Sequence, residues 1–379
     1  MGRTTNNHIK YILGLDGLRA ISVLLVIYFH YASYFPEAFS SSFFLVPAIG
    51  KLLSIGWVGV DIFFVISGFL ITTILIRNPA NSAKKYLTFI QRRAKRLLPA
   101  YFCCVIVVLL AATYIYPDNK IVRNQYLLWT MSSNISTLFG DRSALGGEHF
   151  SMFHFWSLAL EWQFYITFPL ALTLIKSPRT AAMIAIALAV ISRTLLIYLS
   201  PVNYDNAIYS FTFCRGDALA AGVFLATLSP SKNSLKTYAV GAIGLCLFAV
   251  MLFSLALSST PFKSIFWLQT IGYTAIATSV AMILYFILNI NRDSLALRFL
   301  ELPPITAVGR ASYSLYIWHL PFYPIVVELS KNTFSTPQGQ LIFSAGIATL
   351  ITCTLGALSY KFIESSFMLH RRQINPAMT

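Results

Sequence analysis

The sequence predicts an all-α membrane protein, a polytopic bundle of about ten transmembrane helices with both termini in the cytoplasm. Two observations support this fold class. Of the 379 residues, 57% are hydrophobic and 11% are charged, whereas roughly 25% of the residues in an average soluble domain are charged. Apolar runs of the length that a spanning helix needs, about 20 residues, also recur until about Phe362. We expect one integral-membrane domain over residues 1–379, with its core at 11–362 and no separate soluble domain.

Ten apolar runs predict the spans. They lie at 11–34, 53–76, 97–116, 154–174, 181–199, 208–228, 239–257, 265–288, 305–327 and 341–362. A further run at 126–139 is short and predicts an interfacial or re-entrant segment. With the N-terminus in the cytoplasm, 19 of the 28 Lys and Arg residues fall on the cytoplasmic side and six on the outer side. This skew follows the positive-inside rule. The same skew explains the net charge of +15. We therefore expect the partner to be a lipid bilayer and not nucleic acid.

The first run is unusual because it carries Asp16, Arg19 and His30 at membrane depth. Ionisable groups there cost roughly 2.5–3.5 kcal/mol each and usually face a cavity or a partner. Arg19 and His30 are eleven residues apart, so on a helix they lie within about 20° of one face and about 16 Å apart along the axis. Asp16 falls near the same face. We expect Arg19 near the cytoplasmic side and His30 in the outer half of the membrane.

Other spans place polar residues at a depth similar to that of His30. Asp61 lies in the outer half of the second span. His154 and Glu161 are seven residues apart on the fourth span and share a face, with Ser157 in the same stripe. Either carboxylate could be a hydrogen-bond partner in helix packing, or it could orient the His30 imidazole.

Further buried polar residues occur on later spans. His319 lies mid-membrane on the ninth span, and Arg215 and Asp217 lie on the sixth. We interpret Arg193 and the Arg215–Asp217 pair as structural or cavity-lining charges. Because several spans contribute ionisable groups at one level, we expect these spans to line a cavity.

A basic stretch, QRRAKRLLP, precedes the third span and contains Arg92, Arg93 and Arg96. These residues could serve only to orient the span. They could also bind an anionic, phosphate-bearing ligand at the cytoplasmic face, because the planar guanidinium fork contacts phosphate in two places. The sequence has no zinc motif, no Walker loop and no nucleophile elbow, so we expect no metal.

Five segments occur in order that resemble one known family: LDGLRAISVLLVIYFH, WVGVDIFFVISGFLIT, RRAKRLLPAYF, HFWSLALEWQFYITFPL and GRASYSLYIWHLPF. Together they closely resemble the acyltransferase-3 family of integral-membrane O-acyltransferases over nearly the whole chain. The resemblance implies a ten-span bundle in the bacterial inner membrane. It also implies transfer of an acyl group, usually acetyl, from cytoplasmic acetyl-CoA to a hydroxyl of a surface or lipid-linked glycan such as O-antigen or exopolysaccharide. Because the chain ends about 17 residues after its last span, it resembles the stand-alone type.

The resemblance also implies roles for individual residues. The family's pattern of a basic residue, a ten-residue gap and a histidine falls on Arg19 and His30, and its arginine-rich motif falls on Arg92, Arg93 and Arg96. Its Trp-Ser-Leu-x-x-Glu motif falls on Trp156, Ser157, Leu158 and Glu161.

From these matches we expect acyl-CoA to bind at the four arginines. His30 would act as general base on the acceptor hydroxyl and be oriented by Asp61 or Glu161. His154, Trp156, Ser157 and His319 are then candidates for contacting the acceptor or the oxyanion. The sequence is also compatible with a covalent acyl-histidine intermediate.

A second class of function fits part of the same pattern. Ten spans with buried charges at mid-depth also suit a transporter or flippase for a glycolipid or an anionic solute. Against this class, the two halves of the sequence show no repeat, and the arginine cluster has no obvious role in transport. A structural membrane scaffold explains the polar residues poorly.

Overall fold

The structure, a computed structural model, describes residues 11–40, 45–139, 144–147, 149–199, 204–231, 233–258 and 260–367. Within these ranges the chain forms helices and no β-strand, and one isolated bridge joins Gly146 to Ser151. The prediction of an all-α membrane bundle is therefore confirmed. Six of the basic residues counted above lie outside the described ranges: Arg3, Lys10, Arg142, Lys232, Arg371 and Arg372.

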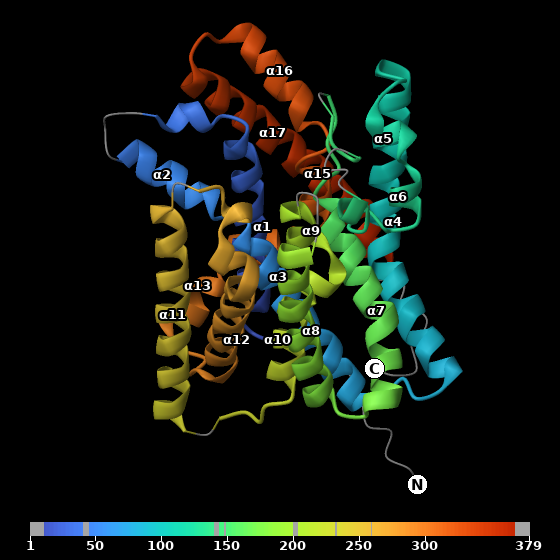
Figure 1. Cartoon of the computed structure of the whole chain (residues 1–379), viewed down its shortest axis with the longest axis vertical. Helices are drawn as coiled ribbons and strands as arrows, with labels where there is room; N and C mark the ends of the chain where they lie inside the picture. Colours follow the sequence, from blue (N-terminus) through green and yellow to red (C-terminus); the bar gives the residue numbers. More distant parts are fainter. Residues whose placement is uncertain are drawn as a thin grey trace.

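The longer helices form the body of the bundle, and most of them run along its long axis (Figure 1). They are α1 (Leu15–Ser33), α3 (Val58–Arg77), α4 (Ala83–Ile115), α7 (Phe155–Ile175), α8 (Pro178–Leu199), α10 (Thr212–Ala226), α11 (Ser234–Leu257), α12 (Tyr273–Asn289) and α17 (Pro337–Ser359). The shorter helices are α2 (Leu45–Ser54), α5 (Lys120–Arg123), α6 (Tyr126–Trp129), α9 (Asp205–Ser210), α13 (Leu295–Leu300), α14 (Pro303–Arg310), α15 (Ser312–Trp318) and α16 (Tyr323–Thr333). Single turns are η1 (Pro36–Phe39), η2 (Ser136–Phe139), η3 (Phe262–Ser264), η4 (Leu268–Gly272) and η5 (Tyr360–Glu364).

Eight helical stretches in the described chain are long and apolar enough to cross a membrane. They correspond to eight of the ten predicted spans. The other two predicted spans, 208–228 and 305–327, are interrupted helices, which explains the difference between ten and eight. The short apolar run at 126–139 forms two single-turn helices, α6 and η2.

Both interruptions have a local cause. Phe211 separates α9 from α10 in an extended conformation, with ψ at 137°. The ninth predicted span breaks first at Ala311 and again after Trp318. There Leu320 precedes Pro321, and a residue before proline is disfavoured in the helical conformation. Non-helical backbone at membrane depth is tolerated where protein surrounds it, and Trp318, His319 and Leu320 are buried.

Helix α4 begins well before the predicted third span and includes the basic stretch. The side chain of Ser82 caps it by accepting a hydrogen bond from the backbone N–H of Lys85. The arginines are therefore helical, and residues three apart share a face whereas adjacent residues do not. Arg93 and Arg96 face the interior, and Arg92 is exposed.

Helix α1 packs against α3, which carries Asp61, against α15, which precedes His319, and against α14 and α17. Residues outside α1 fix the position of its first turn. Gly14 adopts a φ of +84°, and its N–H donates to the Glu301 carboxylate at 2.6 Å. A Cβ added to Gly309 would overlap the carbonyl oxygen of Asp16. Glycine therefore permits the close approach of α14 to α1.

Helices α3 and α10 also cross closely. A Cβ on Gly68 would overlap the carbonyl oxygen of Leu219, and a Cβ on Gly222 would overlap that of Val65. Each helix thus contributes one glycine to a reciprocal contact, as small residues do where membrane helices approach closely.

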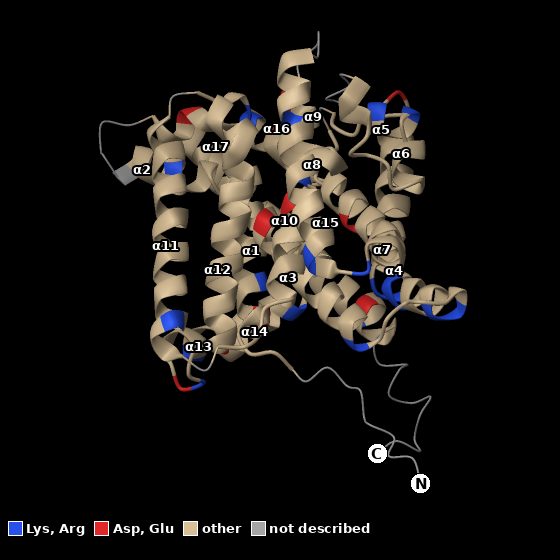
Figure 2. Cartoon of the chain, turned by 60° about the horizontal axis from the view of Figure 1, so that its bottom comes forward, with Lys and Arg blue, Asp and Glu red and all other residues tan. Residues whose placement is uncertain are grey.

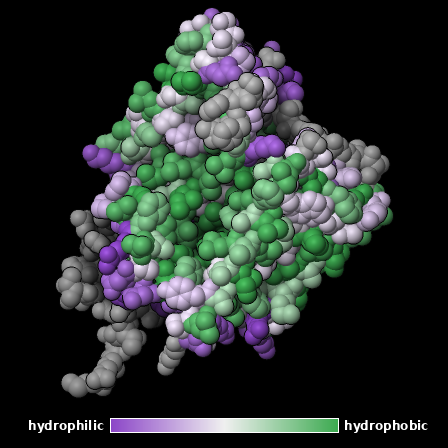
Figure 3. Space-filling view, turned by 90° about the vertical axis from the view of Figure 1, so that its left-hand side faces the viewer, coloured by the Kyte–Doolittle hydropathy of each residue, from purple (hydrophilic) through white to green (hydrophobic). Residues whose placement is uncertain are grey.

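The exterior fits a protein embedded in lipid. Large apolar side chains such as Leu188, Val250 and Leu350 are exposed, and Figure 3 shows a broad apolar band with hydrophilic residues toward its ends. Lys and Arg gather at one end, near the start of α4 and around α13 and α14, at the lower side of Figure 2. We call this the basic end. The chain is a multi-pass membrane protein.

Candidate functional site

A cavity of about 90 Å³ lies inside the bundle, between α1, α3, α4, α7 and α15. Most of its wall is apolar, and three arginines and one glutamate supply its charged groups. The lining residues are Arg19, Val60, Phe63, Phe64, Ile66, Ser67, Leu70, Ile71, Arg93, Arg96, Leu97, Ser157, Leu158, Glu161, Tyr165, Ser312, Tyr313 and Tyr316. The cavity thus brings together five of the predicted site residues from three helices.

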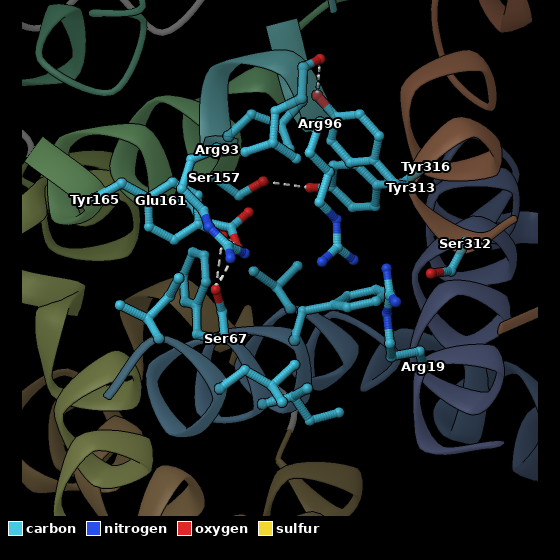
Figure 4. A pocket seen from close by; sticks show the side chains of 18 residues that line it. Arg19, Ser67, Arg93, Arg96, Ser157, Glu161, Tyr165, Ser312, Tyr313 and Tyr316 are labelled. Carbon is cyan, nitrogen blue, oxygen red and sulfur yellow. Dashed lines mark hydrogen bonds between the residues drawn. The ribbon is translucent and has the colours of Figure 1, made fainter. Parts of the chain in front are cut away.

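The three arginines enter the cavity from two helices. Arg19 comes from α1, and Arg93 and Arg96 come from successive turns of α4. Figure 4 shows the guanidinium groups of Arg19 and Arg96 directed toward one another, with Arg93 on the other side of the cavity beside Glu161. Because like charges repel in a poorly solvated site, this arrangement favours an anionic ligand between them. Arg92, predicted with them, is exposed and does not line the cavity.

Glu161 is fixed by two hydroxyl groups. Its Oε1 accepts a hydrogen bond from Ser67 Oγ at 2.5 Å and another from the hydroxyl of Tyr165. Ser67 Oγ and the Tyr165 hydroxyl are themselves 2.9 Å apart. These contacts tie α3 to α7 on the same side of the cavity as Arg93.

Three histidines form a cluster next to the cavity. The ring centroid of His319 lies 5.0 Å from that of His30 and 4.6 Å from that of His154. His154 and His319 are almost fully buried, and His30 is half-buried. The three come from the outer part of α1, from the residue before α7 and from the break after α15, so the interruption of the ninth predicted span places His319 here.

The hydrogen bonds of this cluster select one neutral arrangement of protons. His319 Nδ1 lies 2.5 Å from the carbonyl oxygen of Tyr316 and therefore donates. Its Nε2 then accepts from His30 Nδ1, which lies 3.2 Å away and is also 2.9 Å from the carbonyl oxygen of Val26. In this assignment the lone pair of His30 is on Nε2. His154 donates from Nε2 to the carbonyl oxygen of Ile317 at 3.2 Å.

Among the described residues, no carboxylate forms a hydrogen bond with His30. Asp61, one of the two predicted orienting groups, accepts a hydrogen bond from Arg215 at 2.8 Å, and both side chains are fully buried. Glu161, the other, is held by Ser67 and Tyr165. Among the described residues, His319 is the side chain that hydrogen-bonds to His30.

The buried charges on α10 also pair differently from the prediction. Arg215 and Asp217 were expected to form a pair. Residues two apart on a helix point in different directions, and each instead pairs with another helix. Arg215 binds Asp61 of α3, and Asp217 binds Arg193 of α8 at 2.8 Å. Both pairs fit the structural role that was one interpretation of these charges.

Two other predicted residues lie away from the cavity. Trp156 packs its ring against Phe64 and Tyr209. Asp16 lies in the first turn of α1, where a carboxylate complements the partial positive charge of the helix N-terminus. Ser157, in contrast, lines the cavity and hydrogen-bonds to the Tyr316 hydroxyl.

Five polar residues that line the cavity were not predicted from the sequence: Ser67, Tyr165, Ser312, Tyr313 and Tyr316. Tyr165 follows Glu161 by four residues, a spacing that places two side chains together on a helix and gives a usable signal. Ser67 and Tyr316 reach the site through packing between helices, which no local spacing reveals. In the described part of the chain, no group of His, Cys, Asp and Glu side chains is arranged to hold a metal ion.

Comparison with known proteins gives a consistent result. The model of the acyltransferase domain family matches residues 12–358. The O-acetyltransferase OatA of Staphylococcus aureus strain NCTC 8325 / PS 47 is 31% identical over 94% of this chain, and its counterpart in strain COL has the same identity and coverage. The chain spans 57% of the length of these relatives. No solved structure matches the chain significantly.

The family model covers nearly all of the described bundle, including the arginine-lined cavity and the histidine cluster, and it confirms the resemblance found in the sequence. This chain belongs to the acyltransferase-3 family.

Proposed function

We propose that this protein transfers an acyl group, most simply acetyl, from a coenzyme A thioester to a hydroxyl of a glycan, with His30 as the general base. One observation supports the proposal above all others. A cavity lined by three arginines ends against Tyr316, whose ring lies beside the hydrogen-bonded His30–His319 pair. An anionic donor and a proton acceptor can therefore meet inside one bundle.

The donor binds from the basic end. Arg19, Arg93 and Arg96 contact its phosphate groups, because guanidinium groups form strong, charge-assisted hydrogen bonds to phosphate. A volume of about 90 Å³ suits a narrow acylated arm better than a nucleotide, so the nucleotide head stays at the cavity mouth. By the positive-inside rule the basic end faces the cytoplasm, where acyl-CoA is present, and the membrane is the inner membrane of a bacterium.

His30 removes the proton from the acceptor hydroxyl. The His319 contact holds its ring with the lone pair on Nε2. The hydroxyl oxygen then attacks the thioester carbonyl carbon and forms a tetrahedral oxyanion. When the carbon–sulfur bond breaks, the thiolate takes the proton from His30, so that the ester, free coenzyme A and neutral His30 are regenerated. Ser157, on the cavity wall nearest the histidines, can donate a hydrogen bond to the oxyanion.

The acceptor reaches His30 from the side of the membrane opposite the basic end. Two observations support a glycan acceptor. The relatives are named O-acetyltransferases, which fits transfer to oxygen. The half-buried ring of Phe29 lies beside His30, and the half-buried ring of Phe262 packs against Phe29. Aromatic rings of this kind stack on sugars. The match to an acyltransferase family also favours transfer over the transporter function considered above.

Transfer of label tests the proposal. Purified protein is placed in liposomes with bacterial lipid-linked glycans and acetyl-CoA labelled in the acetyl group. We expect label to enter the glycan fraction and to leave it after mild base, because oxygen esters are labile to base and N-acetyl amides are not. Movement of glycolipid across the bilayer without any use of the donor would contradict the proposal and favour a flippase.

A further inference from the structure

Tyr316 stands between the cavity and the histidine cluster. Its side chain lines the cavity, and its ring centroid lies 5.4 Å from those of both His154 and His319. Only 5% of Tyr316 is exposed. Among the described residues that line the cavity there is no histidine. One aromatic ring therefore separates a ligand in the cavity from the cluster that would act on it.

Hydrogen bonding among two hydroxyl groups and one carbonyl oxygen holds this ring in place. The Tyr316 hydroxyl lies 2.6 Å from Ser157 Oγ and 3.1 Å from the carbonyl oxygen of His154. Ser157 Oγ also donates to that carbonyl oxygen at 3.0 Å. Figure 4 shows the Ser157–Tyr316 contact across one end of the cavity. The edge of the Phe63 ring packs near Tyr316, with centroids 6.1 Å apart, and completes the wall.

The surroundings of Tyr316 allow this ring to move. Helix α15 has seven residues, follows a turn at Ala311 and ends before His319. The restraining contacts involve two hydroxyl groups and one carbonyl oxygen. Rotation of the Tyr316 side chain would break them without breaking any backbone hydrogen bond of α15. The Ser157 hydroxyl would then be released toward the cavity.

We propose that Tyr316 is a gate between the acyl donor and the outer half of the protein. In the closed state it keeps the donor thioester away from His30 and from water that enters from the side opposite the basic end. Acceptor binding opens it, and the thioester then meets His30. Exclusion of water from a reactive intermediate is a general requirement of acyl transfer. The link between opening of the Tyr316 gate and acyl transfer rests on the proposed function, whereas the physical barrier that Tyr316 forms does not.

Chemical labelling measures the barrier without any enzymatic turnover. A reporter cysteine is introduced by Leu70→Cys in a chain whose five native cysteines are replaced by alanine. Leu70 lines the cavity from α3. A membrane-impermeant thiol reagent is applied separately to the basic side and to the opposite side, in membrane vesicles of known orientation.

We expect the reporter to react from the basic side with Tyr316 present or absent. From the opposite side it should react only after Tyr316→Ala. Tyr316→Phe keeps the ring and loses the hydroxyl contacts, so it should raise labelling from that side by about threefold to tenfold, as expected for the loss of about one net hydrogen bond. Equal labelling from the opposite side with Tyr316 and with Tyr316→Ala, in protein that labels normally from the basic side, would overturn the gate.

Donor hydrolysis provides the second readout. Without acceptor, Tyr316→Ala should hydrolyse acetyl-CoA faster than the wild type. The matched control is Tyr101→Phe, which removes a buried tyrosine hydroxyl bonded to the Leu128 carbonyl oxygen at 2.9 Å, outside the cavity. It should change neither readout. If the wild type uses no acyl-CoA in the presence of acceptor, the proposed function is wrong, and the labelling result still decides whether Tyr316 is a barrier.

Discussion

His319 Nε2 lies 3.2 Å from His30 Nδ1, although 289 residues separate the two histidines in the sequence. This contact joins the outer part of α1 to the backbone break that follows α15. It fixes the ring of His30 and the position of its lone pair. In many enzymes a carboxylate orients a catalytic imidazole. Among the described residues, the side chain that hydrogen-bonds to His30 is instead a second imidazole.

The first prediction concerns this pair. His319→Ala should lower kcat for acyl transfer by about 100-fold, because a small misplacement of a catalytic group costs about that much. Donor affinity should change little, since His319 does not line the cavity. Initial rates and donor binding are measured on the same preparation. His319→Gln, which can still accept a hydrogen bond from His30, should recover part of the rate. An unchanged kcat in His319→Ala would exclude a positioning role.

The second prediction separates arginines that are close in sequence. Arg93→Ala and Arg96→Ala should each weaken acetyl-CoA binding by about 10- to 100-fold, which corresponds to the 1.5–3 kcal/mol of a hydrogen bond to a charged group. Arg92→Ala is the matched control, because Arg92 is exposed on the same helix and does not line the cavity. Equilibrium binding of labelled donor tests all three variants. Equal losses in all three would mean that the stretch acts through its total charge.

The third prediction concerns the crossing of α3 and α10. Gly68→Ala should destabilise the protein by about 1–3 kcal/mol or more, because the added methyl group meets the Leu219 carbonyl oxygen and forces the helices apart. Gly346→Ala on α17 is the control, since its Cβ would meet no atom within 4 Å, and alanine is the better helix former. Thermal unfolding in detergent compares them. Equal Tm values for the two variants would contradict the close crossing.

The fourth prediction concerns the buried Asp61–Arg215 pair. Asp61→Asn should cost about 3–5 kcal/mol of stability, because it leaves a buried guanidinium charge without its partner. The double variant Asp61→Leu/Arg215→Met removes both charges and should be more stable than Asp61→Asn. Yield and Tm in detergent measure this. A double variant that folds well but transfers no acyl group would show that the pair contributes to catalysis as well as to folding.

Sequence patterns predicted much of the fold because membrane helices leave a strong local signal. The lengths of the apolar runs predicted eight of the spans. The first of these runs placed Arg19 and His30 on one helix, α1. The two interrupted spans were not predicted as such. The break at Phe211 depends on backbone conformation inside a packed protein, whereas Pro321 is a local signal for the break after Trp318.

The sequence indicates which polar residues are buried in the bundle better than it indicates which of their side chains meet. Arg93 and Arg96 line the cavity, and their role in binding acyl-CoA stays a prediction. The orienting carboxylate of His30 was not found, because Asp61 faces Arg215 across the α3–α10 crossing. Which side chains meet depends on the rotation of each helix about its axis. Local spacing does not determine that rotation.

The most direct test of the account is acyl transfer by the wild type and by His30→Ala, side by side in liposomes with labelled acetyl-CoA and lipid-linked glycan. If His30 is the general base, the wild type should show thioester loss and base-labile label on the glycan. For His30→Ala the transfer rate should be lower by about 100-fold or more, as for the loss of a general base, with donor binding retained. Transfer by folded His30→Ala at the wild-type rate would contradict the central claim that His30 is the base.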